Sequence, residues 1–263
     1  MRVIAVRRTV LAATAVSFAL LATACGGGDG GATKGGATSG EQAAKAYTAA
    51  ELEKRMVAQG DIDGHDVKKP GKQDVSDPAG LSVGKAECEP VAQALSALAT
   101  GKPAASVQRL VVHESAAAKK GMPSMEELAE MTEKEAQEAM IDSLDITKTR
   151  TSLWSYDADG AAQALTALRE AGKKCAGGFT MTIDGEKQQV TKVSEEKLPV
   201  GEEAVAWTVG TKQGDATGDT KVVVFRQGST LAGFSSFNIA AVSRGEAFPQ
   251  PTAVIKAQAA KLG

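Results

Sequence analysis

The chain has 263 residues, of which 43% are hydrophobic and 24% are charged, a composition typical of globular proteins. Its 30 basic and 32 acidic side chains give a formal net charge of −2. This balance argues against the basic surface by which proteins bind nucleic acid, so no nucleic-acid partner is expected. Aromatic residues make up only 4%, so the core must consist mainly of Val, Leu, Ile and Ala.

The first 24 residues carry the three zones of a bacterial export signal. A basic start with three arginines precedes an apolar run over 10–21, and small residues occupy 22–24. Cys25 follows at once, ahead of three glycines, as in the lipobox of bacterial lipoproteins. We expect residues 1–24 to be a lipoprotein signal peptide that is removed, and Cys25 to be lipidated.

Two alternatives to this interpretation are an ordinary cleaved signal with an incidental cysteine and an uncleaved membrane helix. The apolar run is shorter than the roughly 20 residues that span a membrane. A lipoprotein cysteine carries two acyl chains, which hold a protein stably at a membrane where one chain does not. The expected location is the extracytoplasmic face of the cell membrane, with the lipid as anchor. Arg7 and Arg8 alone do not decide between the Sec and Tat export routes.

Residues 25–46 are expected to form the lipidated end and a flexible tether. They consist largely of Gly, Ala, Ser and Thr, which bury too little apolar surface to offset the entropy of ordering the chain. A coil of about 20 such residues reaches about 25 Å. Removal of 1–24 takes away three arginines and no acid, so 27 basic and 32 acidic residues leave a net charge of −5. An extracytoplasmic domain is expected over 47–263.

Helical patterns dominate the first half of this domain. Thr48 and Glu51 form a capping box that begins a helix, and Cys88 opens another. Apolar residues at helical spacing predict further helices within 124–144 and over 160–174. The helix within 124–144 contains several methionines, which commonly fill irregular gaps in cores. We expect it to lie on the surface of the core, with a mobile lid as the alternative.

Alternation of apolar and polar residues predicts β-strands, most of them in the second half. Asp184-Gly185 suits a two-residue hairpin turn, in which both positions need positive φ. A last helix is predicted over 254–262. This order predicts a single α+β domain, with helices packed on one face of an antiparallel β-meander sheet. The strands are expected at 65–68, 106–113, 149–156, 179–183, 189–193, 204–211, 220–226 and 230–237.

The two remaining cysteines are predicted to form a disulfide. Cys88 and Cys175 are the only possible pair once Cys25 is lipidated, and exported proteins have oxidised cysteines. The bond would close a loop of 87 residues, which contributes about 4–5 kcal/mol in the chain-entropy model. A redox-active pair is the alternative. It typically needs Cys-x-x-Cys at a helix N-terminus, whereas Cys175 follows the end of a predicted helix.

Several short motifs recur in the same order in a known family. They are the capping-box helix, Cys88-Glu89-Pro90, Trp154-Ser155-Tyr156-Asp157, Gly160-Ala161-Ala162 through Cys175, the segments 222–228 and 231–234, and 257–262. With them, the chain resembles the actinobacterial lipoproteins that are related to the extracellular sensor domain of the mycobacterial Ser/Thr kinase PknH. The resemblance implies an antiparallel sheet with helices and a ligand-binding cleft, and it brings no catalytic residues. The kinase form has two disulfides, whereas this chain has cysteines for one.

No established catalytic or metal-binding motif is present in the sequence. It has neither a Gly-x-Ser-x-Gly elbow nor a His-Glu-x-x-His pair. A hydrolase built on Ser235 and His113 is the enzymatic alternative. The run from Asp157 to Gly160 lacks the later ligands of a calcium loop, so a helix N-cap is predicted there. No catalytic residue, metal site or cofactor is expected.

The sequence therefore predicts a membrane-anchored lipoprotein whose domain is not an enzyme but binds a ligand or partner, as a sensor does. The partner would be an unidentified ligand or protein of the cell envelope. A cell-envelope hydrolase with an unrecognised active site is the alternative. Trp154, Tyr156 and Trp207 would line a cleft or belong to the core, and the core is favoured. No ligand-binding residue is assigned.

Overall fold

The structure, a computed structural model, describes residues 45–263. The predicted signal peptide over 1–24 and the lipidation of Cys25 lie outside the described residues. The predicted tether lies outside them as well, apart from its last two residues. Within 45–263, no helix combines the length and the apolar character needed to cross a membrane.

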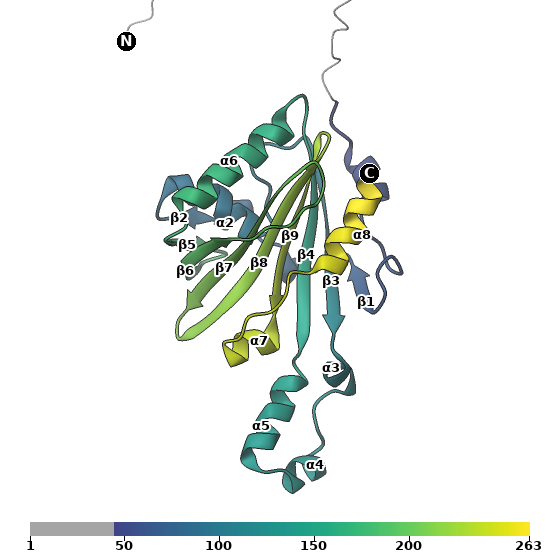
Figure 1. Ribbon diagram of the computed structural model, residues 1–263, viewed down its shortest axis with the longest axis vertical. Helices are drawn as coiled ribbons and strands as arrows, with labels where there is room; N and C mark the ends of the chain where they lie inside the picture. The colour runs from purple at the N-terminus through teal and green to yellow at the C-terminus, as the bar shows by residue number, and fades with distance from the viewer. Residues whose placement is uncertain (1–44) are drawn as a thin grey trace, which may run out of the picture. The chain divides into compact units, whose positions relative to one another are not determined.

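The domain is built on one sheet of nine antiparallel strands (Figure 1). The strands lie in the order β1-β3-β4-β9-β8-β7-β6-β5-β2. Strands β5 to β9 form a meander, because each pairs with the next one along the chain. The strands are β1 (His65–Lys68), β2 (Ser82–Val83), β3 (Ala105–Glu114), β4 (Ile146–Ser155), β5 (Phe179–Ile183), β6 (Glu186–Glu195), β7 (Glu203–Gln213), β8 (Ala216–Gln227) and β9 (Thr230–Asn238).

The predicted α+β class with an antiparallel sheet is confirmed. Local sequence signals explain much of it. Asp184 and Gly185 have φ of 51° and 85°, as the predicted hairpin turn between β5 and β6 requires. The sheet is larger than the meander alone, because β3 and β4 pair with each other and β4 pairs with β9.

Helices cover both faces of the sheet, which corrects the expectation of a single helical face. We call the two faces the α6 face, which α2 and α6 cover, and the α8 face, which α1 and α8 cover (Figure 1). An apolar stripe shows only that a helix is buried on one side, so the sequence did not assign the faces. The helices are α1 (Ala49–Arg55), α2 (Glu89–Leu95), α3 (Ala116–Lys120), α4 (Met125–Glu130), α5 (Glu133–Asp142), α6 (Gly160–Lys174), α7 (Ile239–Arg244) and α8 (Thr252–Leu262).

The core on the α6 face contains the predicted disulfide. Cys88, just before α2, is bonded to Cys175, just after α6, with 5.8 Å between their Cα atoms, and both are fully buried. Trp154, Tyr156 and Trp207 are buried in the same core, as favoured from the sequence. The disulfide therefore ties the two helices of this face together beside the largest side chains.

The core on the α8 face joins the two ends of the domain. Leu52 of α1 and Ile255 of α8 pack in one cluster with Phe225 and Phe234 of the sheet. The fully buried Gln258 completes the contact: its Oε1 accepts from the backbone N–H of residue 57 (3.0 Å), and its Nε2 donates to the carbonyl of residue 55 (2.7 Å). The carbonyl of residue 55 is one of those that the C-terminal end of α1 leaves unpaired, and the N–H of residue 57 lies just beyond that end.

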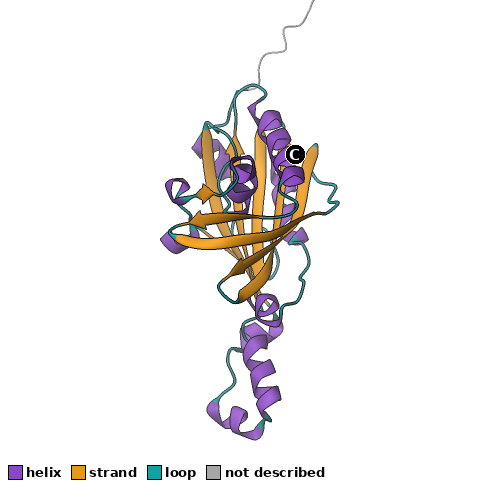
Figure 2. Cartoon of the chain, turned by 90° about the vertical axis from the view of Figure 1, so that its left-hand side faces the viewer, coloured by secondary structure: helices purple, strands orange, loops and turns teal. Residues whose placement is uncertain are grey.

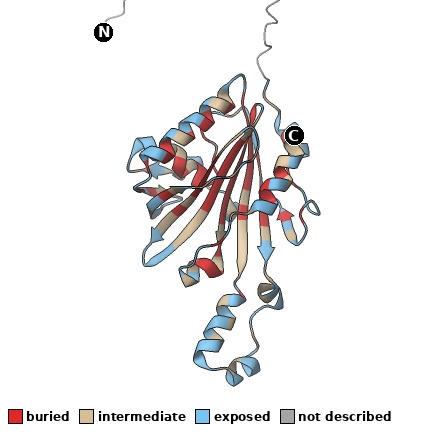
Figure 3. Cartoon of the chain, in the orientation of Figure 1, coloured by how far each residue is buried: buried red, intermediate tan, exposed pale blue. Residues whose placement is uncertain are grey.

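The segment 115–145, which we call the arm, extends away from the sheet between β3 and β4 (Figures 1 and 2). Its helices α4 and α5 have no buried residue, and the arm is coloured almost entirely as exposed or half-buried in Figure 3. Exposed apolar side chains in the arm include Met122, Met125, Met140 and Leu144. The expectation that this methionine-bearing stretch lies on the core is therefore wrong.

Candidate functional site

The α6 face is only partly covered, and a cleft of about 370 Å³ opens where the helices end. Along β8, residues 221–225 are buried, 218–220 are half-buried and 216–217 are exposed. The cleft therefore lies over the strand ends beyond the C-terminal end of α2, with β4, β9, β8 and β7 contributing to its lining. Its volume falls within the range of small-molecule sites.

Arg150 is the charged group that this cleft encloses. Along β4 it shares its face with Ser152 and Trp154, because side chains alternate along a strand, and Trp154 belongs to the α6-face core. Its Nη2 donates to the carbonyl of Leu95 at the end of α2 (3.1 Å), and its Nη1 donates to Ser76 Oγ (3.4 Å). The same carbonyl accepts from Ser235 Oγ (2.6 Å), which anchors the end of α2 to β9.

Arg150 differs from most of the other partly buried arginines in its charge environment. Arg55, which also lacks an ion pair within the described residues, lies over the Tyr47 ring, 4.3 Å from its centroid. Arg109, Arg169, Arg226 and Arg244 each form an ion pair with an acidic side chain. Arg150 forms none within 4.0 Å of any acidic side chain of residues 45–263, and its Nε is buried without a hydrogen-bond partner among them. Burial lowers the pKa of its guanidinium, and two more distant carboxylates act in the opposite sense.

Apart from Arg150, no charged side chain of the lining points into the cleft. Asp219 is the one other charged lining residue, but its place in β8 is one before Thr220 and three before Val222 of the α6-face core. Alternation therefore directs the Asp219 carboxylate to the opposite face. Hydroxyl and amide groups and a few apolar side chains supply the remaining surface, among them Thr211, Gln188, Gln213, Ile183, Phe237 and Val242.

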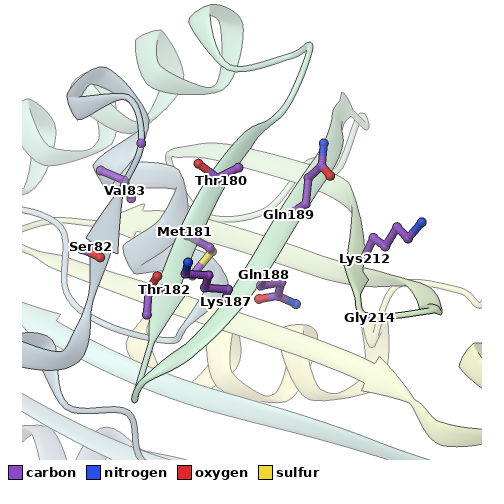
Figure 4. Close-up of a pocket in the computed structure, with 11 residues that line it drawn as sticks. Ser82, Val83, Thr180, Met181, Thr182, Lys187, Gln188, Gln189, Lys212 and Gly214 are labelled. Atoms are coloured by element: carbon purple, nitrogen blue, oxygen red, sulfur yellow. The ribbon is translucent and has the colours of Figure 1, made fainter.

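A larger hollow, of about 550 Å³, lies near the sheet edge that β2 forms, and residues of β2, β5, β6 and β7 line it (Figure 4). We call it the edge groove. Its side chains are mostly exposed, and Met181 is the one buried lining residue. Lys187 and Lys212 extend from it in different directions (Figure 4). Since no buried polar group converges on it, the edge groove is the weaker candidate.

The two histidines of the chain meet at the other edge of the sheet. His65 of β1 lies opposite His113 of β3, with ring centroids 4.8 Å apart beside a hollow of about 250 Å³. Burial and the neighbouring His65 lower the pKa of His113. Ser235 shares a face with Leu231 of the α6-face core, whereas His113 shares one with Val111 of the α8-face core. The structure therefore does not bring together the Ser235–His113 pair of the hydrolase alternative.

The aspartates before α6 have structural contacts. Asp159 is the N-cap residue of α6 as predicted, but its side chain accepts from Gln163 Nε2 (2.7 Å) and does not cap the backbone. Asp157 Oδ1 accepts from the backbone N–H of Ala46 (3.0 Å). Across residues 45–263, no group of three or more His, Cys, Asp or Glu side chains is arranged to hold a metal ion.

Sequence reasoning did not single out Arg150. One signal was available: Arg150 lies four residues before Trp154 in a predicted strand, so both belong to the same face. A tryptophan indicates that this face of the strand is buried. A charged arginine on a buried face is costly unless a partner or a ligand balances its charge. The enclosure itself was not predictable, because it depends on where α2 ends against β9.

Comparison with known proteins gives a structural likeness but no match in sequence. No protein-family model matches the chain. No curated protein matches it either. The structure is similar to the crystal structure of the extracellular domain of PknH from Mycobacterium tuberculosis, with a TM-score of 0.48 and 12% sequence identity over 83% of this chain and 95% of that chain. At this level of similarity, nothing that is known of that domain is carried over to this chain.

Proposed function

We propose that this protein is a lipid-anchored, extracytoplasmic binding protein, and that its ligand occupies the cleft on the α6 face. The observation that carries the proposal is the cleft itself, which is preformed and encloses a fixed polar group, Arg150. Concave sites with a few convergent polar groups are typical of ligand binding. Export and anchoring rest on the signal sequence and on Cys25.

The cleft chemistry suits binding better than catalysis. The lining groups of residues 45–263 that reach the cleft are hydroxyls, amides, apolar side chains and one guanidinium. Ser235, the most buried hydroxyl there, donates to the Leu95 carbonyl, and no histidine lines the cleft. Nucleophilic catalysis by serine needs an adjacent general base. The envelope hydrolase weighed from the sequence therefore has no observation in its favour.

Thermal unfolding of the full-length mature protein tests the binding function. It would be followed by calorimetry in mild detergent with a panel of peptidoglycan fragments, oligosaccharides and phospholipid headgroups. A ligand at 100 times its Kd stabilises the folded state by about 2.7 kcal/mol. For a domain of this size, that raises the Tm by roughly 5–10 °C. A panel in which no compound shifts the Tm would contradict the proposal.

Two matched tryptophan variants locate the ligand. Thr220→Trp fills the cleft from β8, and Thr180→Trp fills the edge groove from β5. We expect stabilisation by the ligand to be lost in Thr220→Trp and kept in Thr180→Trp. The reverse result would assign the ligand to the edge groove and contradict the proposed site.

The anchor has a separate test. Cys25→Ala removes the thiol that a lipid would modify, so we expect the variant to leave the membrane fraction of its native host. Each buried methylene contributes about 0.8 kcal/mol to anchoring, and two acyl chains contribute many of them. Cys88→Ala, which removes a disulfide cysteine and leaves Cys25 in place, is the control and should stay with the membrane. Retention of Cys25→Ala in the membrane fraction would rule out the lipid anchor.

A further inference from the structure

We propose that the cleft recognises a carboxylate, and that the guanidinium of Arg150 is the group that binds it. This rests on the proposed function and adds the chemical class of the ligand. The ligand would be a small organic acid with one carboxylate and an apolar body.

The first argument is the unbalanced charge. A cation taken from water into a protein is stabilised when an acidic group pairs with it and is costly when none does. Four arginines of the described domain have such partners and Arg55 lies over the Tyr47 ring, whereas Arg150 has neither. A bound anion would supply the missing charge, so the free energy of ligand binding would include relief of this cost.

The second argument is the orientation of the guanidinium. An arginine side chain has five N–H donors in a planar fork, which matches the two oxygens of a carboxylate. Two of these donors are used, by the Leu95 carbonyl and Ser76 Oγ. Those two contacts fix the fork at the cleft wall, while Nε is buried without a partner in the described residues. Fixed donors lose little entropy when a ligand binds.

The third argument favours a carboxylate over a phosphate. Phosphate carries more negative charge and is commonly bound by several cations or by a helix N-terminus. In this cleft the one charged side chain directed inward is Arg150, and the nearby helix end is the C-terminus of α2, which is partially negative. Asp74 and Asp184 lie close enough to act on Arg150 through space. These negative groups disfavour a second charge on the ligand.

The fourth argument concerns the rest of the ligand. Leu95, Ile183, Phe237 and Val242 give the cleft an apolar portion, and hydroxyl and amide groups lie between them. A body with exposed methylene groups gains about 25 cal/mol for each Å² that such surfaces remove from water. The cleft thus fits an amphipathic acid better than a compact inorganic anion.

Four probes with the same body test this inference. Butyrate, propyl phosphate, butyramide and propylamine all carry a propyl chain and differ only in the head group, and their binding to the full-length protein is measured by titration calorimetry. The Arg150 Nε–H resonance in NMR spectra gives a second, local measurement. We expect butyrate to bind at least about tenfold more tightly than butyramide, as hydrogen bonds to a charged group predict. We expect butyrate to shift the Nε–H resonance of Arg150.

Variants identify the group responsible. Arg150→Gln should weaken butyrate binding at least about tenfold, and Arg150→Lys should weaken it less, because it keeps the charge but loses the fork. Lys148→Gln is the matched control: Lys148 lies on the same strand and face but outside the cleft, so butyrate binding should be unchanged. The comparison of butyrate with butyramide needs no variant, so it decides the question even if Arg150→Gln fails to fold.

The outcomes separate this inference from the proposed function. Equal affinity for butyrate and butyramide, or no binding of any probe, overturns the carboxylate. Tighter binding of propyl phosphate than of butyrate overturns it too and assigns the cleft to phosphate. A neutral envelope oligosaccharide that stabilises the protein, with the effect lost in Thr220→Trp, leaves the binding function standing without the carboxylate.

Discussion

The arm and the rest of the described domain, which we call the body of the protein, are held together by different interactions. In the body, α6 buries an apolar stripe against the sheet, and a disulfide joins its end to the start of α2. In the arm, α4 and α5 bury nothing, yet each begins with a complete capping box, at Ser124 and Thr132. Isolated helices of 6 and 10 residues are marginal in water. The body should therefore set the global stability, and the arm should unfold locally at little cost.

The disulfide provides the largest expected effect on the body. Replacing both cysteines, as Cys88→Ala with Cys175→Ala, releases a loop of 87 residues that contains the whole arm. The free energy of unfolding should fall by about 4–5 kcal/mol, because the unfolded chain regains the entropy of the open loop. Urea denaturation measures this. An unchanged midpoint would show that the bond does not stabilise the folded protein.

The buried glutamine gives a direct contrast between the two regions. Gln258→Ala leaves backbone groups at residues 55 and 57 buried without partners, so we expect a loss of about 2–3 kcal/mol. Gln137→Ala changes an exposed glutamine of the arm and should alter the unfolding midpoint by less than about 0.5 kcal/mol. Equal effects in the two variants would contradict the view that the body alone carries the stability.

A cap substitution should act on the arm alone. Thr132→Ala removes the hydroxyl that accepts the backbone N–H of Glu135 (3.3 Å), which costs the helix about 1 kcal/mol. Hydrogen exchange in α5 should quicken several-fold, while exchange in β8 and β9 stays the same. The control Gln137→Ala leaves the cap intact and should leave exchange near the start of α5 unchanged. Faster exchange throughout the body would contradict local unfolding.

The smallest effect concerns pH. Hydrogen bonds from the backbone and side chain of Ser124 lower the pKa of Glu127, and those of Thr132 lower the pKa of Glu135. A carboxylate with a lowered pKa in the folded state stabilises its helix above the ordinary value of 4.5, and this support is lost as the pH falls through the lowered value. Circular dichroism should show a small loss of helix there, with Trp154 and Trp207 fluorescence unchanged. A fluorescence change at the same pH would mean that the body responds too.

Local signals in the sequence predicted much of the body. The capping box at Thr48, the turn at Asp184-Gly185 and the strand at 65–68 all appear as expected. The pairing of Cys88 with Cys175 is also present. These features depend on neighbouring residues or on the small number of cysteines. Lipidation of Cys25 lies outside the described residues and stays a prediction.

The candidate site was less predictable than the fold. The cleft depends on three segments far apart in sequence: the end of α2, the middle of β4 and the free ends of β7 and β8. No pattern within one segment shows that the others leave a space. Arg150 could have been assigned to the face of Trp154 by alternation, but its lack of an acidic partner appears only when its neighbours are in place.

The sequence by itself determined most of the helices and strands, the turn at Asp184-Gly185 and the cysteine pair, because these depend on nearby residues and on composition. It did not predict β2, α3 or α7. Only the tertiary structure decided which face each helix covers, that the arm stands away from the core, and that Arg150 lies in an open cleft beside the end of α2. The physical reason is the same in each case. Long-range packing chooses among surfaces that are equally apolar in the sequence, and the spaces that it leaves unfilled are set by all of the elements together.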